Sequence, residues 1–244
     1  MQIDISELVP AFPDFRVAVV VASDLAIPAE RPAALDGLIA EREAAARARW
    51  GGLELADIPG VKVWRLAYKG FGIKRTSYRS SVERIVKNVL AERPIPRING
   101  FVDSYNAVSL AHCFPLGADD LDRLTGDIAF RYAREGDSFV DMAAGGEEGE
   151  GGAPGGPVED PPKPGEVVFA DDAHVLCRRW NWRQDARSLV SPETRRALLT
   201  VQSCGVGDLE AAVADVCDLF ARFCGARTAV TFADRDRPRL ALAT

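Results

Sequence analysis

Residues 143–165 contain eight glycines and five prolines and no aromatic residue. A stretch of this composition carries too little apolar surface to form part of a hydrophobic core. It is also longer than the loops that usually connect elements of a compact domain. Strand-like runs resume immediately afterwards, at residues 166–170 and 174–178. We therefore interpret 143–165 as an insertion within one domain of 244 residues, whose core is assembled from the chain on both sides.

The apolar patterns on both sides of this insertion predict a mixture of helices and strands. Ser80 and Glu83 have the spacing of a capping box, and the apolar residues that follow predict a helix over 80–90 with one buried face. Another helix is predicted over 102–114, begun by Asp103 and ended by a proline. The remaining predicted elements are helices at 31–50 and 208–223 and strands at 16–22, 61–67, 229–232 and 239–242.

The insertion and its flanks also dominate the charge of the chain. The formal net charge is −6, which on its own argues against a nucleic-acid partner. Residues 135–172, however, hold eleven acidic residues and one basic residue, a net charge of −10, so the rest of the chain carries +4. The body of the protein is therefore mildly basic, and a weak encounter with nucleic acid is compatible with it.

Other patterns argue for a cytoplasmic protein without a metal or cofactor. The five cysteines are odd in number and no pair has CxxC spacing, which disfavours a disulfide scaffold or a cysteine zinc site. His112 and His174 are far apart, and neither an HExxH motif nor a P-loop is present. No apolar run is long enough for a signal core or a membrane span.

Two stretches combine many polar residues with an apolar context. Residues 98–110 read INGFVDSYNAVSL and lead to PLGADDLD at 115–122, while residues 177–185 read CRRWNWRQD. The first resembles the VDxxNxxxLxxxxPxxxxDxD pattern in the editing domain of the phenylalanyl-tRNA synthetase beta subunit, usually called the B3/B4 domain. The second is similar to stand-alone relatives of that domain. The resemblance extends over residues 78–201, and regions 1–77 (strand–helix–strand) and 202–244 (helix–strand) are additions to it.

This resemblance implies an α+β fold of three layers, with a central β-sandwich or sheet core and peripheral helices. It also implies a free-standing editing factor that hydrolyses the ester of mischarged aminoacyl-tRNA. The editing pocket of the synthetase includes a histidine and a glutamate. The resemblance aligns them with Gly117 and Thr200 of this sequence, so both polar groups are absent. Two alternatives stay open: a non-catalytic RNA-binding module, and a binder or hydrolase of a free amino acid or small amide.

The polar residues of these stretches suggest a chemistry for ester hydrolysis, which requires a positioned water and donors for the developing oxyanion. If residues 177–182 form a strand, Asn181 and Arg183 share a face, and we assign the catalytic role to them together with Thr200. Trp180 is expected to stack on the terminal adenine. The substrate-binding set is completed by Arg178, Asn106, Asp103 and Asp120.

Each of these assignments has a structural alternative. Asp103 and Asn106 have the spacing of residues that cap a helix start, and Asp120 is suited to bracing a turn. The tryptophans could pack in the core, the arginines could form surface ion pairs, and Thr200 could be an ordinary strand residue. Finally, Lys74, Arg75 and Arg79 are expected to contact the tRNA backbone, the alternative being solvated loop residues.

Overall fold

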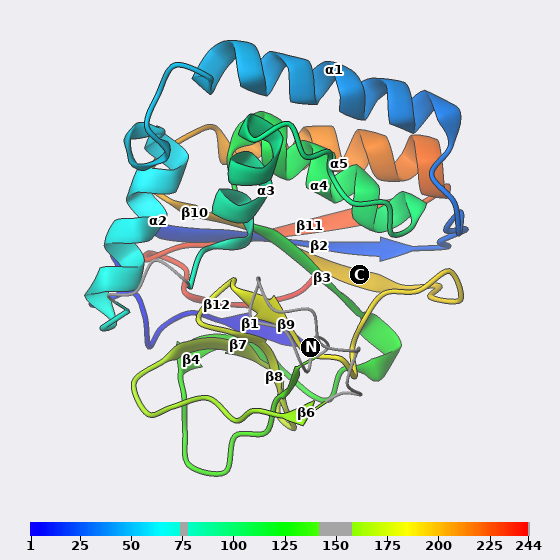
Figure 1. The fold of residues 1–244 in the computed structure, drawn as a ribbon. Coiled ribbons are helices and arrows are strands. Elements are labelled where there is room, and N and C mark those ends of the chain that lie inside the picture. The colour runs from blue at the N-terminus through cyan, green and yellow to red at the C-terminus, as the bar shows by residue number, and fades with distance from the viewer. Residues whose placement is uncertain (74–77, 142–157, 244) are drawn as a thin grey trace.

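A computed structural model describes residues 1–73, 78–141 and 158–243, and these form three layers (Figure 1). Helices cover one face of a four-stranded sheet, and a six-stranded sheet packs against its other face. The expected α+β architecture with a sandwich of sheets and peripheral helices is therefore confirmed. The helices are α1 (Ala33–Trp50), α2 (Pro59–Gly70), α3 (Ser81–Leu90), α4 (Gly100–His112) and α5 (Leu209–Cys224).

Both sheets combine strands from distant parts of the sequence. The four-stranded sheet has the order β11 (Arg227–Ala233), β2 (Phe15–Ser23), β10 (Ala197–Cys204) and β3 (Leu116–Asp120), all antiparallel. The six-stranded sheet has the order β12 (Arg239–Ala241), β1 (Gln2–Asp4), β4 (Ile128–Tyr132), β7 (Val167–Ala170), β8 (Val175–Arg178) and β9 (Arg183–Gln184). A third, two-stranded sheet pairs β5 (Val140–Asp141) with β6 (Val158–Glu159).

Strand β2 shows why the first predicted strand is apolar at every position. Its side chains alternate between two hydrophobic clusters, because the four-stranded sheet is covered on both faces. Val17 and Val19 point to the other sheet, whereas Ala18 and Val20 point to α4 and α5. A strand buried on both faces has a continuous apolar run in place of an alternating pattern.

Three of the four predicted helices lie close to their expected bounds. The Ser80 side chain accepts a hydrogen bond from the Glu83 amide at 3.3 Å, as the capping-box spacing predicts for α3. Asp208 caps α5 in the same way through the Ala211 amide at 2.9 Å. The apolar face of α5 is buried against the four-stranded sheet, apart from the half-buried Phe223.

The strand predicted at 61–67 is wrong, because this segment is the middle of helix α2. Pro59 occupies the first turn, where its missing amide hydrogen costs nothing. Val61, Trp64 and Tyr68 follow helical spacing and are buried on one face. Gly60 lies so close to the end of α4 that a Cβ atom there would approach the Cys113 carbonyl oxygen to 2.6 Å.

Helix α4 begins earlier than predicted. Its cap is Asn99, whose side chain accepts hydrogen bonds from the amides of Phe101 and Val102 at 3.1 and 2.9 Å. Asp103 lies one turn inside the helix and does not begin it.

Most of the predicted insertion, residues 143–157, falls outside the described residues. Within the described ranges, no helix combines the length and the apolar composition needed to cross a membrane.

Candidate functional site

A cavity of about 360 Å³ lies where the two sheets and two helices meet. Helices α3 and α4 and the connecting segment 95–98 form one side of it, and strands β3, β9 and β10 form the other. Its apolar lining consists of Ile85, Val89, Ile95, Pro96, Ile98, Val102, Leu116 and Phe169. Its polar lining includes Ser81, Arg84, Asn88, Tyr105, Asn106, Asp119, Asn181, Arg183, Gln184, Thr200 and Gln202.

The three residues assigned to catalysis, Asn181, Arg183 and Thr200, all line this cavity. Asn106, assigned to substrate binding, joins them from helix α4. No side-chain hydrogen bond of Asn106 is formed with the part of the chain that the structure describes, so its amide is available to a ligand. The structure therefore brings together four of the eight residues proposed for catalysis and substrate binding.

A one-way chain of hydrogen bonds runs along the cavity wall. The Tyr68 hydroxyl donates to Asn181 Oδ1 at 3.0 Å, and Asn181 Nδ2 donates to Gln202 Oε1 at 3.0 Å. Gln202 Nε2 then donates to Thr200 Oγ1 at 3.0 Å, and the Thr200 hydroxyl donates to the Gly117 carbonyl oxygen at 3.4 Å. Burial raises the pKa of Tyr68 well above its ordinary value, so the tyrosine remains a donor. Both ends of the Asn181 amide are therefore already engaged.

The two positions that the resemblance aligns with the histidine and glutamate of the synthetase lie directly opposite each other. Thr200 on β10 pairs with Gly117 on β3 in the antiparallel ladder. A Cβ atom at Gly117 would meet Gln184 Oε1 at 3.4 Å, so Gln184 borders the space beside the glycine. Gln184 in turn donates to the Ala118 carbonyl at 2.8 Å, which links β9 of one sheet to β3 of the other.

The segment 177–182 is not a continuous strand. Strand β8 ends at Arg178, and Arg179 and Trp180 both have left-handed backbone conformations, with φ of 46° and 67°. The resulting turn leads into β9, which begins at Arg183. Asn181 and Arg183 therefore reach the same cavity through a hairpin turn and not through the alternation of a single strand.

The two tryptophans of this turn lie in different environments, one in the hydrophobic core and the other at the cavity. Trp180 is fully buried and packs edge-on against Phe15 and Trp64, as in the structural alternative of core packing, and no part of it lines the cavity. Trp182 lines the cavity instead. Its ring lies 4.2 Å from the Arg179 guanidinium carbon and 4.5 Å from that of Arg183, two cation–π contacts.

Arg178 is also placed away from the cavity. Its side chain is 1% exposed and binds both carboxylate oxygens of Glu166, at 3.1 and 2.7 Å. It also forms an ion pair with Asp160. These contacts engage the guanidinium donors of Arg178 within the protein, as in the structural alternative of an ion pair, and its substrate-binding role stays a prediction.

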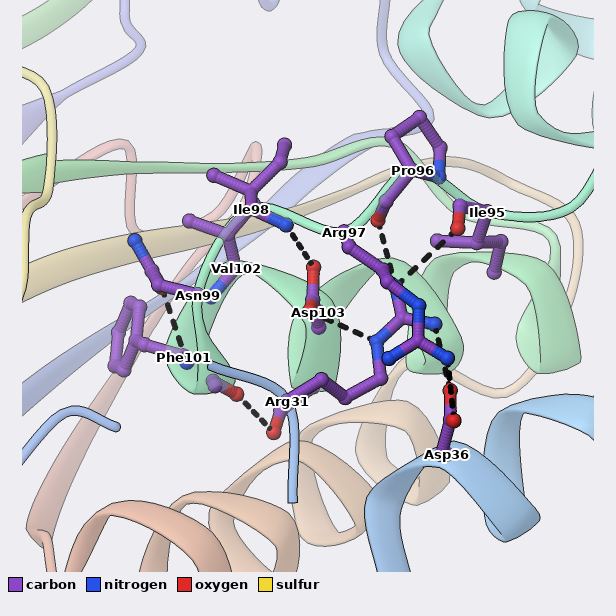
Figure 2. Close-up of polar contacts among 12 residues, drawn as sticks. Arg31, Asp36, Ile95, Pro96, Arg97, Ile98, Asn99, Phe101, Val102 and Asp103 are labelled. Carbon is purple, nitrogen blue, oxygen red and sulfur yellow. Dashed lines mark hydrogen bonds and ion pairs between the residues drawn. The ribbon is translucent and has the colours of Figure 1, made fainter. Parts of the chain in front are cut away.

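Asp103 stabilises the segment 95–98, which lines the cavity, and Figure 2 shows its polar contacts. Its carboxylate is fully buried and accepts from Arg31 Nε at 2.9 Å and from the Ile98 amide at 3.0 Å. The Nη2 atom of Arg31 also donates hydrogen bonds to the carbonyl oxygens of Ile95 and Pro96, at 3.2 and 2.6 Å. Asp103 is not among the residues that line the cavity, and its contact with substrate stays a prediction; in the structure the Arg31–Asp103 pair holds the segment 95–98 against α4.

Asp120 braces a turn, which is the structural alternative for this residue. Its carboxylate accepts from the Thr194 hydroxyl at 2.7 Å and from the Asp122 amide at 3.1 Å. It is not among the residues that line the cavity, and its assignment to substrate binding stays a prediction. Among the residues expected at the tRNA backbone, Lys74 and Arg75 fall outside the described residues. Arg79 is half-buried and pairs with Glu83 at 3.1 Å.

Sequence reasoning missed Asp119, the neighbour of Asp120. Asp119 is 1% exposed and lines the cavity, whereas Asp120 points to the other face of β3. Burial raises the pKa of the Asp119 carboxyl to about 7, against the hydrogen bonds from Ser188 and Gln184 that lower it. The signal that could have found it is the two-residue period of a strand, which places Asp119 on the same face as Gly117.

The cavity wall also contains polar atoms without a partner. Ser81 Oγ and Trp182 Nε1 are buried and form no hydrogen bond within the described residues. A buried polar atom without a hydrogen bond costs free energy, which a suitable ligand in the cavity would recover. No group of three or more histidine, cysteine, aspartate or glutamate side chains in the described ranges could hold a metal ion.

Comparison with known protein families decides the family of this chain. The B3/4 domain matches residues 63–225, which is more than half of the sequence. The chain belongs to the B3/4 domain family. The match includes α3, α4 and every strand that lines the cavity of this B3/4 protein. No curated protein matches it.

Among solved structures, the B3/4 protein is similar to an N-terminal fragment of the phenylalanyl-tRNA synthetase beta subunit from Pyrococcus horikoshii. The identity is 12% and the TM-score 0.42, over 93% of this chain. The chain spans about half the length of that structure, 50%.

Proposed function

We propose that this B3/4 protein is a free-standing tRNA-editing factor, which hydrolyses the ester bond of mischarged aminoacyl-tRNA. The observation that carries the proposal is a single cavity of about 360 Å³ to which Asn106, Arg183 and Thr200 contribute from separate elements. The cavity combines an apolar half, suited to an amino-acid side chain, with polar groups suited to an ester. Membership of the B3/4 domain family is consistent with a function related to tRNA synthetases.

In the proposed reaction, a water molecule attacks the ester carbonyl carbon and forms a tetrahedral oxyanion. The bond to the ribose oxygen then breaks, and this oxygen takes the proton that the attacking water loses, so that the products are a free amino acid and tRNA. Asn106 and Arg183 are the proposed donors to the carbonyl oxygen, because the Asn106 amide is uncommitted and Arg183 has several donors besides the one used by Asp141. Thr200 and Asn181 position this wall through their hydrogen-bond chain.

The first experiment is a deacylation screen of the purified protein against a panel of mischarged tRNAs. For a tRNA that is deacylated, Asn106→Ala is expected to lower kcat about 100-fold, the usual effect of losing one oxyanion donor. Arg222→Ala is the control, because Arg222 is exposed on α5 and does not line the cavity. The editing proposal fails if every tRNA in the panel stays charged.

The missing imidazole and carboxylate at Gly117 and Thr200 favour one rival, a non-catalytic RNA-binding module. Binding of uncharged tRNA without deacylation, and a steep loss of affinity as salt rises, would select this rival. Thermal stabilisation by free amino acids but not by tRNA would select the other alternative, a binder of small molecules.

A further inference from the structure

The polar half of the cavity contains a buried carboxyl group with one free oxygen. Asp119 Oδ1 accepts from the Ser188 hydroxyl at 2.6 Å and from the Gln184 side chain. Oδ2 forms no hydrogen bond with the described part of the chain, and the residue lines the cavity. Two neutral groups thus fix the orientation of the carboxyl and leave one oxygen available to an occupant of the cavity.

The charges around this carboxyl are unusual for a buried acid. No described lysine, arginine or histidine forms an ion pair with Asp119. The carboxylates of Asp185 and Asp171 act against its ionisation, in addition to burial. A buried carboxylate without a cation is costly, so the site favours either a proton or a positively charged ligand. The titratable and charged side chains nearest to it or on the cavity lining are Arg84, Tyr105, Asp171, Cys177, Arg183 and Asp185.

The other half of the cavity limits what kind of cation fits. Ile85, Val89, Val102 and Phe169 line it with aliphatic and aromatic carbon. Apolar walls next to one carboxyl suit a ligand that carries an apolar group a few bonds from an ammonium group. An α-amino acyl group has this arrangement, and a phosphate or a free carboxylate does not.

We propose that Asp119 is the recognition residue for the primary ammonium group of a ligand whose apolar side chain occupies the rest of this cavity. The inference rests on the proposed function in one respect, that the cavity receives an aminoacyl group. It does not depend on hydrolysis. Asp119 then acts as a binding residue that distinguishes amines from neutral molecules of the same shape.

The test measures binding of two matched pairs of small molecules by isothermal titration calorimetry at pH 7.5. Leucinol and phenylalaninol carry the ammonium group, whereas 4-methylpentan-1-ol and 3-phenylpropan-1-ol have the same carbon skeletons without it. The wild-type protein is expected to bind each amine at least about tenfold more tightly than its partner, because one charge-assisted hydrogen bond is added. Equal affinity within a pair, or no binding of either amine, overturns the proposal.

The variant for this test is Asp119→Asn, which keeps the shape of the side chain and removes the charge. It should lose the preference for amines while it retains the affinity for the neutral alcohols. Asp122→Asn is the matched control, because Asp122 pairs with Arg196 outside the cavity and the preference should persist. Thermal melting of both variants shows whether they are folded. A folded Asp119→Asn protein that still prefers amines overturns the assignment.

The number of protons released when an amine binds provides a second readout. A purely structural role of Asp119 would not produce such a release. Below pH 7 the Asp119 carboxyl of the empty cavity is largely protonated, so an ammonium group that binds to it must displace the proton. Calorimetry at pH 6 in buffers of different ionisation enthalpy should therefore show proton release in the wild type and none in Asp119→Asn. Amine affinity should fall as the pH drops from 7.5 to 6, and an unchanged affinity would contradict the proposal.

The two proposals can fail separately. If no mischarged tRNA is deacylated but the protein binds amines more tightly than the neutral alcohols, and Asp119→Asn loses this preference, the editing function is refuted and the ammonium site is supported. If deacylation is observed while Asp119→Asn keeps the full preference for amines, the editing function stands and the ammonium site falls.

Discussion

At the scale of single residues, the surroundings of a side chain decide its role more than its type does. Asn181 has the donor and the acceptor that a catalytic amide needs, but Tyr68 and Gln202 engage both. Asn106 has the same functional group and no such contact. Sequence alone cannot separate the two, because the partners of Asn181 lie 113 and 21 residues away along the chain.

This difference predicts unequal effects of two equivalent substitutions. Asn181→Ala should lower the free energy of unfolding by about 1–3 kcal/mol, because it leaves the buried Tyr68 hydroxyl and the Gln202 side chain without their partner. Asn106→Ala, the matched control, should change it by less than about 0.5 kcal/mol. Urea denaturation of the two variants measures both values. Equal losses would contradict the hydrogen-bond chain.

Asp119 predicts a dependence of stability on pH. Its pKa is about 7 in the folded protein and 3.8 when exposed, so between these values the folded state holds a proton that the unfolded state has lost. Its contribution to stability is therefore largest below pH 4 and is lost as the pH rises toward 7, with a slope of at most about 1.4 kcal/mol per pH unit.

The substitution Asp119→Asn should remove this term. The stability of the variant relative to the wild type should therefore increase as the pH is raised from 5 to 8. Guanidinium denaturation of both proteins across this range gives the difference. A constant difference would show that Asp119 has an ordinary pKa.

At the scale of elements, the capped helices α3 and α5 were predictable, whereas helix α2 and the tight turn after β8 were not. The spacing around α3 and α5 indicates their caps and their buried faces, because both are local properties. The turn at Arg179 and Trp180 has no local signal, since neither residue is one that favours a left-handed backbone. Trp180 is placed there by its contacts with aromatic rings of distant segments.

The start of α3 offers a test with two adjacent serines. Ser80→Ala should destabilise the protein by about 1 kcal/mol, because it removes the cap that binds the Glu83 amide. Ser81→Ala should be neutral or slightly stabilising, because Ser81 Oγ is buried without a partner. Thermal and chemical denaturation can rank the two variants, and the reverse order would refute the assignment of the cap.

At the scale of the whole molecule, the sequence predicts the class of fold and the region of the site, but not how the site is assembled. The resemblance placed Gly117 and Thr200 in one pocket, and the ladder between β3 and β10 pairs them directly. It could not show that Gln184 joins the two sheets. Nor could it separate Asp119, which lines the cavity, from Asp120, which supports a turn. Contacts between distant strands determine both outcomes.

The Arg31–Asp103 pair connects the segment before α1 to the distant region 95–103, and its loss should have a large effect. Asp103→Asn should destabilise the protein by about 3–5 kcal/mol, because it leaves a buried guanidinium without its nearest carboxylate. Asp36→Asn is the control, since Asp36 contacts the same arginine from an exposed position and its loss should cost much less than that of Asp103. Similar losses in urea denaturation would argue against a brace at Asp103.

The position of the cavity between the two sheets has a consequence for how such a protein can evolve. Ile98 and Asn106 contact its interior, yet Ile98 is half-exposed and belongs to neither of the two large hydrophobic clusters, and the Asn106 side chain forms no hydrogen bond within the described residues. Substitutions at these positions can therefore change which ligand is selected while the inherited scaffold stays intact. Related chains that have diverged in preference should differ first along this seam, and only later in the packing beneath it.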